Sequence, residues 1–158
     1  MKKVLVAYFS ATGITASVAE KLAKTTGADL FEIKAKQTYT DADLNWQDKQ
    51  SRSSIEMADV NCRPEIASKI EDMDQYQTVF VGFPVWWYRE PSIIDTFMES
   101  YNFDGKTVIP FATSGGSEIG DSGKNMQKLA PNAVVDSGER FSSSVSDENL
   151  KNWASKWV

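Results

Sequence analysis

The sequence contains no histidine and a single cysteine, Cys62, and these absences exclude several classes of site. Without histidine there is no Ser-His-Asp or Cys-His triad, no histidine-ligated zinc and no imidazole acid–base catalysis. A lone cysteine cannot form an internal disulfide, which suits a reducing compartment. Whatever chemistry this protein supports, histidine takes no part in it.

Positive charge and long hydrophobic runs are also scarce. The 158 residues include 17 lysines and arginines against 22 aspartates and glutamates, a formal net charge of −5. Nucleic-acid binding is therefore disfavoured, because a phosphate backbone requires a basic surface. No apolar run approaches the roughly 18 residues of a membrane-spanning helix, and the run at residues 4–9 is shorter than the roughly 7–15 residues of a signal-peptide core. We expect a cytoplasmic protein that binds neither nucleic acid nor membrane.

The composition that remains is ordinary for a globular protein, with enough apolar side chains for one full core. Apolar runs alternate with helical periods, which predicts βαβ units and a parallel sheet. Strands are expected at residues 3–9, 29–34, 78–83, 106–111 and 133–135. Helices are expected at residues 13–24, from Pro91, at residues 124–129 and around Leu150 to Trp157. We predict an α/β fold, a three-layer doubly wound parallel sheet of five strands in the order 2-1-3-4-5, forming a single domain over residues 1–158.

Two local details of this assignment are open to test. The first helix is expected to bury one face, formed by Ile14, Val18, Ala19, Leu22 and Ala23. Residues 36–62 are polar and acidic, and we interpret them as an insertion with partial structure. A capping-box pattern from Ser53 to Glu56 predicts a short helix there, and Pro64 predicts the start of another. The inward residues of that second helix would be Ile66, Ala67 and Ile70.

A loop rich in hydroxyl groups follows the first predicted strand. It consists of Ser10, Ala11, Thr12, Gly13, Ile14 and Thr15. The free N–H groups and dipole of the helix that follows favour an anion, hydroxyls can donate to phosphate oxygens, and Gly13 allows close approach of the backbone. The loop contains no lysine or arginine, and the glycine patterns of ATP-binding and dinucleotide-binding loops are absent, which favours a terminal phosphate monoester. The alternative is that Ser10 and Thr12 only cap the helix.

Two further loops follow the third and fourth predicted strands. The candidate binding residues are Pro84, Val85, Trp86, Trp87 and Tyr88 in the second loop, and Thr113, Ser114, Gly115, Gly116 and Ser117 in the third. Consecutive aromatic residues cannot all enter the core, and they would offer a stacking surface to a flat conjugated ligand. The backbone groups of the third loop could contact the edge of a heterocycle. The alternatives are a hydrophobic cap or subunit interface for the second loop and a plain flexible loop for the third.

These three loops are expected at one edge of the sheet, because the carboxyl ends of parallel strands meet there. A phosphate site, an aromatic surface and a polar backbone rim together fit a monophosphate attached to a planar ring. Flavin mononucleotide (FMN) meets this description, and a purine nucleotide does so too.

The first loop resembles the [ST]-x-T-G-x-T phosphate loop of the flavodoxin family, and the other two resemble the flavin-ring loops of flavodoxin-like proteins. The resemblance implies a flavodoxin-like fold and noncovalently bound FMN, with residues 10–15 at the phosphate and residues 84–88 and 113–117 along the isoalloxazine ring. Many flavodoxins have a glycine in the second loop, whose peptide can rotate to accept a hydrogen bond from the reduced ring. Residues 85–90 contain no glycine.

By this resemblance the chain would be an FMN-binding electron-transfer protein that serves redox partner proteins, as a monomer or weak homodimer, without catalytic or metal-binding side chains. We therefore expect Asp95, Glu118 and Asp121 to be solvated carboxylates. Two alternatives stay open: an FMN-dependent NAD(P)H:quinone-type oxidoreductase, and a non-redox interaction module on the same fold. Steady NAD(P)H consumption with a quinone would favour the first, and a colourless protein that takes up no FMN would favour the second.

Overall fold

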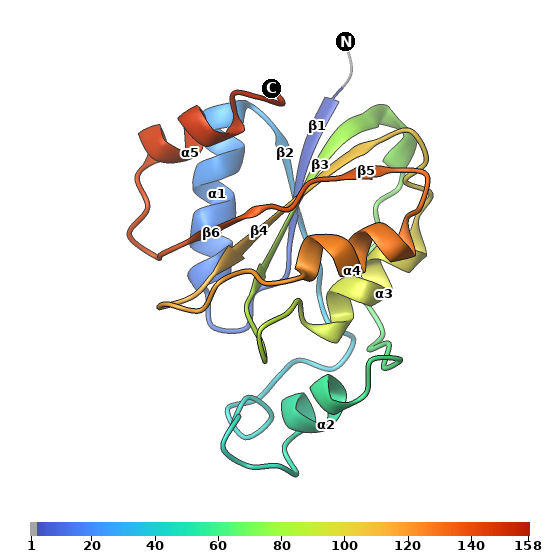
Figure 1. Cartoon of the computed structure of the whole chain (residues 1–158), viewed down its shortest axis with the longest axis vertical. Helices are drawn as coiled ribbons and strands as arrows, with labels where there is room; N and C mark the ends of the chain where they lie inside the picture. The colour runs from blue at the N-terminus through green and yellow to red at the C-terminus, as the bar shows by residue number, and fades with distance from the viewer. Residues whose placement is uncertain (1–2) are drawn as a thin grey trace.

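The computed structural model describes residues 3–158, which form a parallel sheet between two layers of helices (Figure 1). The main strands are β1 (Lys3–Tyr8), β2 (Asp29–Glu32), β3 (Tyr76–Pro84) and β4 (Thr107–Thr113). The sheet order is β2-β1-β3-β4-β5, and every pairing is parallel. The predicted fold class and strand order are confirmed.

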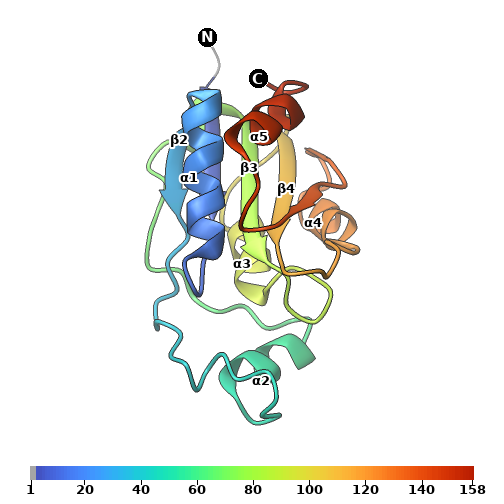
Figure 2. The same cartoon turned by 90° about the vertical axis from the view of Figure 1, so that its left-hand side faces the viewer.

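The two helical layers explain why the central strands read as continuous apolar runs. Along β1, Leu5 and Ala7 pack into the core under α3 (Ser92–Ser100) and α4 (Ser122–Leu129), whereas Val6 and Tyr8 pack under α1 (Ile14–Thr26) and α5 (Asp147–Ala154). Successive side chains of a strand point to opposite faces, so a strand that is covered on both faces needs apolar residues at every position. Figure 2 shows α1 and α5 together on one face of the sheet.

The far edge of the sheet differs from the prediction. Two short strands, β5 (Val134–Val135) and β6 (Glu139–Phe141), both pair with β4, and the sequence predicted only the first. The break between them lies opposite Pro110, which has no N–H to donate. At the break Gly138 has φ 82°, and an added Cβ would lie 2.4 Å from the Pro110 carbonyl oxygen. Strand β6 then brings residues 139–141 alongside the end of β4.

Residues 36–62 extend beyond the edge of the sheet where the strands end (Figure 2). Their one helix, α2 (Arg52–Ala58), begins earlier than predicted: Ser51, not Ser53, caps it, and the Ser51 hydroxyl accepts a hydrogen bond from the Ser54 N–H at 3.3 Å. Glu56 therefore takes no part in the cap, and its carboxylate accepts hydrogen bonds from Tyr39 and Arg52 instead.

The predicted helix after Pro64 is wrong, because this segment is extended. The Lys36 N–H donates to the Glu65 carbonyl at 2.9 Å, and the Ala67 N–H donates to the Lys34 carbonyl at 2.7 Å. This antiparallel pairing satisfies the backbone groups that a helix would otherwise satisfy. Burial accordingly alternates, so Ala67 is exposed rather than inward. A short 3-10 helix, η1 (Met73–Gln75), leads into β3.

Candidate functional site

The three loops singled out in the sequence meet at the carboxyl edge of the sheet and enclose a cavity of about 350 Å³. We call it the hydroxyl cavity. Its lining residues are Ala11, Thr12, Ile14, Thr15, Pro84, Thr113, Ser114, Gly115, Ser142 and Ser143. Ile14 was expected in the core but is 46% exposed, because the first turn of α1 projects past the sheet into this cavity.

The first loop lines this cavity with Thr12 and Thr15, and Gly13 shapes the turn between these two residues. Gly13 precedes α1 with φ 93°, a left-handed conformation that favours glycine, and its N–H donates to Ser10 Oγ at 3.1 Å. Thr15 is buried, and its hydroxyl lies 2.6 Å from that of Thr113, which ties the first loop to the end of β4. Among the described residues, no side chain caps α1 and no acidic residue occupies its first turn. The N-terminus of α1 is therefore suited to an anionic group.

Ser142 and Ser143 are cavity residues that sequence reasoning missed. They follow β6, and because that strand was not predicted, the run of serines at residues 142–144 could not be placed at the site. Strand β6 also carries Arg140, whose Nε and Nη2 donate to the hydroxyl and carbonyl oxygens of Ser114 at 3.0 and 2.8 Å. The third loop is thus held by a cation that lies far from it in sequence.

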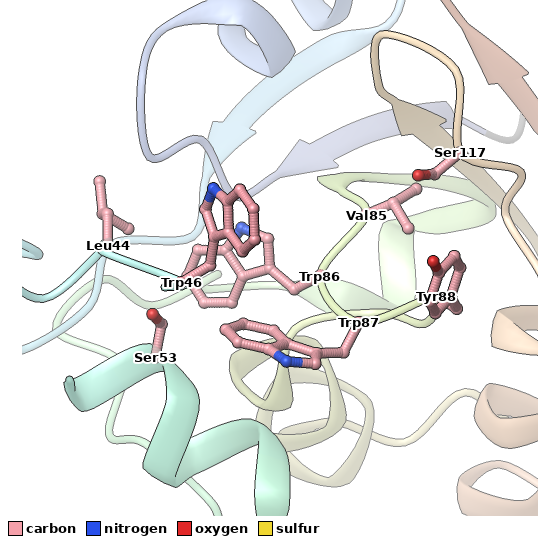
Figure 3. A pocket seen from close by; sticks show the side chains of 8 residues that line it. All are labelled: Leu44, Trp46, Ser53, Val85, Trp86, Trp87, Tyr88 and Ser117. Carbon is pink, nitrogen blue, oxygen red and sulfur yellow. The ribbon is translucent and has the colours of Figure 1, made fainter. Parts of the chain in front are cut away.

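A second cavity, of about 470 Å³, is lined by the second and third loops and by residues 36–62 (Figure 3). We call it the aromatic cavity. Its lining residues are Leu44, Trp46, Ser53, Val85, Trp86, Trp87, Tyr88 and Ser117. The first three come from residues 36–62, which the sequence left unplaced. None of these lining residues, all within the described part of the chain, carries a charge. Of the predicted site residues, only Ser10, Gly13 and Gly116 line neither cavity.

A tight turn determines how far each aromatic residue of the second loop is exposed. The N–H of Trp86 donates to the Arg89 carbonyl and the N–H of Arg89 to the Trp86 carbonyl, each at 3.1 Å. Between them Trp87 and Tyr88 have φ 49° and 64°. Such left-handed conformations cost roughly 1–2 kcal/mol per non-glycine residue and tend to occur at ligand sites. The turn packs Trp86 against Phe9 and leaves Trp87 and Tyr88 exposed.

A polar cluster that includes two buried carboxyl groups, Glu90 and Asp95, supports this turn. Arg89 donates to the Met57 carbonyl at 3.1 Å and lies 3.7 Å from the carboxylate of Asp95, and Asn125 donates to Glu90 at 3.1 Å. Glu90 and Asp95 are buried, so the expectation of a solvated Asp95 is wrong, whereas Glu118 and Asp121 are exposed as expected. Burial, and after it the neighbouring carboxylate of Glu90, raises the pKa of Asp95 to about 8.

This pKa predicts that the protein loses stability as the pH rises. Between pH 4 and 8 the folded protein retains the Asp95 proton that the unfolded chain, with an ordinary carboxyl, releases. The free energy of unfolding should therefore fall across this range and level off above it. We expect Asp95→Asn to flatten the decline, measured as urea midpoints at pH 5 and pH 9. Asp104→Asn, at an exposed aspartate, is the matched control, and an equal pH dependence in all three proteins would contradict the assignment.

Residues 36–62 are joined to the same region by a second, partly buried cluster. Tyr39 donates to Glu56 at 2.5 Å, Arg52 donates to the other carboxylate oxygen of Glu56 at 2.8 Å, and the Arg52 guanidinium lies 3.7 Å from the centre of the Tyr39 ring. The Tyr39 ring also packs edge-on against Trp86, with 5.4 Å between ring centres. The wall of the aromatic cavity that comes from residues 36–62 is therefore part of the folded site.

Comparisons with known proteins agree with this architecture. A sequence model of the flavodoxin family matches residues 3–157. A solved structure from Bacteroides eggerthii, assigned as a flavoprotein, is 47% identical with a TM-score of 0.92, over 99% of this chain and 98% of that chain. A similarly assigned protein from Bacteroides uniformis is 46% identical with a TM-score of 0.92, over 98% of both chains.

A more distant solved structure contains a bound ligand. A flavoprotein from Lactobacillus acidophilus, in complex with FMN, is 25% identical with a TM-score of 0.72, over 98% of this chain and 99% of that chain. No protein of curated function matches the sequence. Because the family model spans nearly all of the described residues and the fold agrees with it, the chain belongs to the flavodoxin family.

Proposed function

We propose that this protein binds FMN noncovalently and transfers electrons through it. The observation that carries the proposal is the pairing of two cavities along the same loops, one lined by hydroxyls at the N-terminus of α1 and one lined by uncharged aromatic residues. A phosphate suits the first cavity and a flat conjugated ring suits the second. FMN, the cofactor of the flavodoxin family and the ligand of the Lactobacillus acidophilus flavoprotein, joins both groups in one molecule.

Residues 10–15 would hold the phosphate, with Ser142 and Ser143 beside them, and residues 84–88 and 113–117 would line the isoalloxazine ring. When bound, FMN supplies the redox chemistry, and the protein binds, orients and tunes it. The uncharged aromatic lining would exclude water from the ring, and Arg140 would keep the third loop in place through Ser114. The chain needs no catalytic side chain of its own for this role.

The proposal predicts that purified protein is yellow, or becomes yellow on addition of FMN, with one FMN bound per chain. The measurement is the visible absorbance after removal of free FMN, followed by heat release and identification of the chromophore. A protein that takes up no flavin would overturn the proposal and favour a non-redox interaction module, in which the exposed aromatics form an interface.

The aromatic cavity favours a second candidate function, an FMN-dependent NAD(P)H:quinone-type oxidoreductase. Leu44, Trp46 and Ser53 give the cavity a wall beyond the strand-end loops, which a carrier that docks only on proteins does not require. Steady consumption of NADPH by the FMN-loaded protein in the presence of a quinone would support this candidate. The absence of consumption, with reduction of a partner protein, would support the carrier.

The remaining features of the proposed role are less specific. We infer a single domain that works in the cytoplasm as a monomer or weak homodimer and exchanges electrons with redox partner proteins. In residues 3–158 no helix has the length and hydropathy needed to span a bilayer. The lone cysteine, which is partly buried, fits a reducing compartment.

A further inference from the structure

The side chain of Trp46 has no evident role in packing the fold. It is 70% exposed, although tryptophan is highly buried on average in folded proteins. It lines the aromatic cavity together with Trp87, which is 43% exposed and comes from the turn after β3 (Figure 3). Two incompletely covered indoles from separate segments of the chain thus face one cavity, and such clustering of exposed apolar surface marks a binding site.

The loop that carries Trp46 is fixed by hydrogen bonds at both ends. On one side Thr40 and Asp43 exchange side-chain to backbone hydrogen bonds at 3.0 and 3.1 Å, and the Asp43 carbonyl accepts from the Ser53 N–H at 3.0 Å. On the other side the Ser54 hydroxyl donates to the Asp48 carbonyl at 2.7 Å. The backbone that carries the indole is therefore held before any ligand binds, which reduces the ordering cost of binding.

The two guanidinium groups near the aromatic cavity, those of Arg52 and Arg89, already have hydrogen-bond partners within the protein. The cavity therefore favours a neutral ligand. The guanidinium of Arg52 pairs with Glu56, and that of Arg89 donates to the Glu90 and Met57 carbonyl oxygens at 3.2 and 3.1 Å. A pyrophosphate or an acidic peptide would meet no cation among the lining residues, all of them in the described part of the chain.

We infer that the Trp46 wall of the aromatic cavity binds a neutral planar conjugated small molecule, and that this molecule accepts electrons from the FMN of the proposed function, on which the inference rests. Val85 and Ser117, on the loops shared with the hydroxyl cavity, would face the cofactor, and Trp46 and Leu44 would face the acceptor. Quinones belong to this class. Reduction of a quinone to the hydroquinone takes two electrons and two protons, which one fully reduced FMN supplies on returning to its oxidised form.

The test measures binding rather than turnover. FMN-loaded protein is dialysed to equilibrium against duroquinone, a neutral planar quinone whose fully substituted ring does not alkylate Cys62, or against anthraquinone sulfonate, a planar quinone with a negative charge. We expect duroquinone to bind and the sulfonate to bind at least about tenfold more weakly. Trp46→Ala should weaken duroquinone binding about tenfold, whereas Trp46→Phe, which keeps a planar ring, should stay within about threefold of the wild type. Ile55→Ala, at an exposed apolar residue of the same segment outside the cavity lining, should leave binding unchanged.

The outcomes separate this inference from the proposed function. Bound FMN is measured for every variant by its visible absorbance. If FMN is retained but Trp46→Ala binds duroquinone as the wild type does, or the sulfonate binds equally well, the acceptor site is wrong and FMN binding stands. If Trp46→Ala loses FMN itself, Trp46 contacts the cofactor and the inference is again wrong. If the wild type takes up no FMN, the proposed function fails and the acceptor site fails with it.

Discussion

Replacing Thr12 and Thr15 together by valine is expected to raise the dissociation constant of FMN at least about 100-fold. Each hydrogen bond to a charged group contributes roughly 1.5–3 kcal/mol, so losing two costs about 3–6 kcal/mol, and every 1.4 kcal/mol is about tenfold in affinity. Valine has nearly the shape of threonine, so the change removes the hydroxyl groups and little else. Fluorescence titration of FMN, which is quenched on binding to many aromatic sites, gives the dissociation constants.

The rise in the dissociation constant of FMN should come from the loss of hydroxyl groups at the hydroxyl cavity, and not from replacing any threonine near α1. Thr25→Val is the matched control, because Thr25 lies at the other end of the same helix and its hydroxyl donates to the Leu22 carbonyl at 3.1 Å. Thr15 also contacts Thr113, so the urea midpoint of the double variant is measured to exclude a loss of folded protein. FMN binding that is unchanged in the folded double variant would show that the first loop does not hold the phosphate.

Gly82→Ala is expected to destabilise the protein by about 3 kcal/mol, which is a large fraction of the stability of a domain of this size. Gly82 lies in β3, in register between Tyr8 of β1 and Phe111 of β4, and all three positions face the layer of α1 and α5. An added Cβ would lie 2.2, 2.4 and 2.8 Å from three ring atoms of Phe111. Because Phe111 is fully buried, its ring cannot move aside without displacing the core.

Urea unfolding of paired variants tests this steric cause. In a Phe111→Leu background, where the ring is absent, the same alanine should cost markedly less, and the difference measures the coupling between the two positions. Gly116→Ala is the control for replacing a glycine as such, since no atom lies within 4 Å of its added Cβ. A Gly82→Ala midpoint equal to that of the wild type would contradict the assigned contact.

Sequence patterns located the elements and loops that depend on local order. Strands β1 to β5, the buried face of α1 from Val18 to Ala23, and the loops at residues 10–15, 84–88 and 113–117 lie where period and composition predicted them. The errors occurred where the chain pairs with distant segments. Residues 64–70 form an extended segment because residues 34–36 supply their hydrogen-bond partners, and β6 exists because the end of β4 offers an unpaired edge.

The sequence by itself determined that a parallel doubly wound sheet would gather hydroxyl, aromatic and glycine-rich loops at one edge. This was possible because a helix or strand that is buried on one face or on two shows a periodic spacing of apolar residues within its own sequence. Only the tertiary structure decided which groups lose their contact with water and which lie at the site. It buries Asp95, places Ser142 in the hydroxyl cavity and Arg140 beside Ser114, and places Trp46 in the wall of the aromatic cavity. The residues that surround these groups are distant from them in the sequence, so no local sequence pattern predicts the contacts.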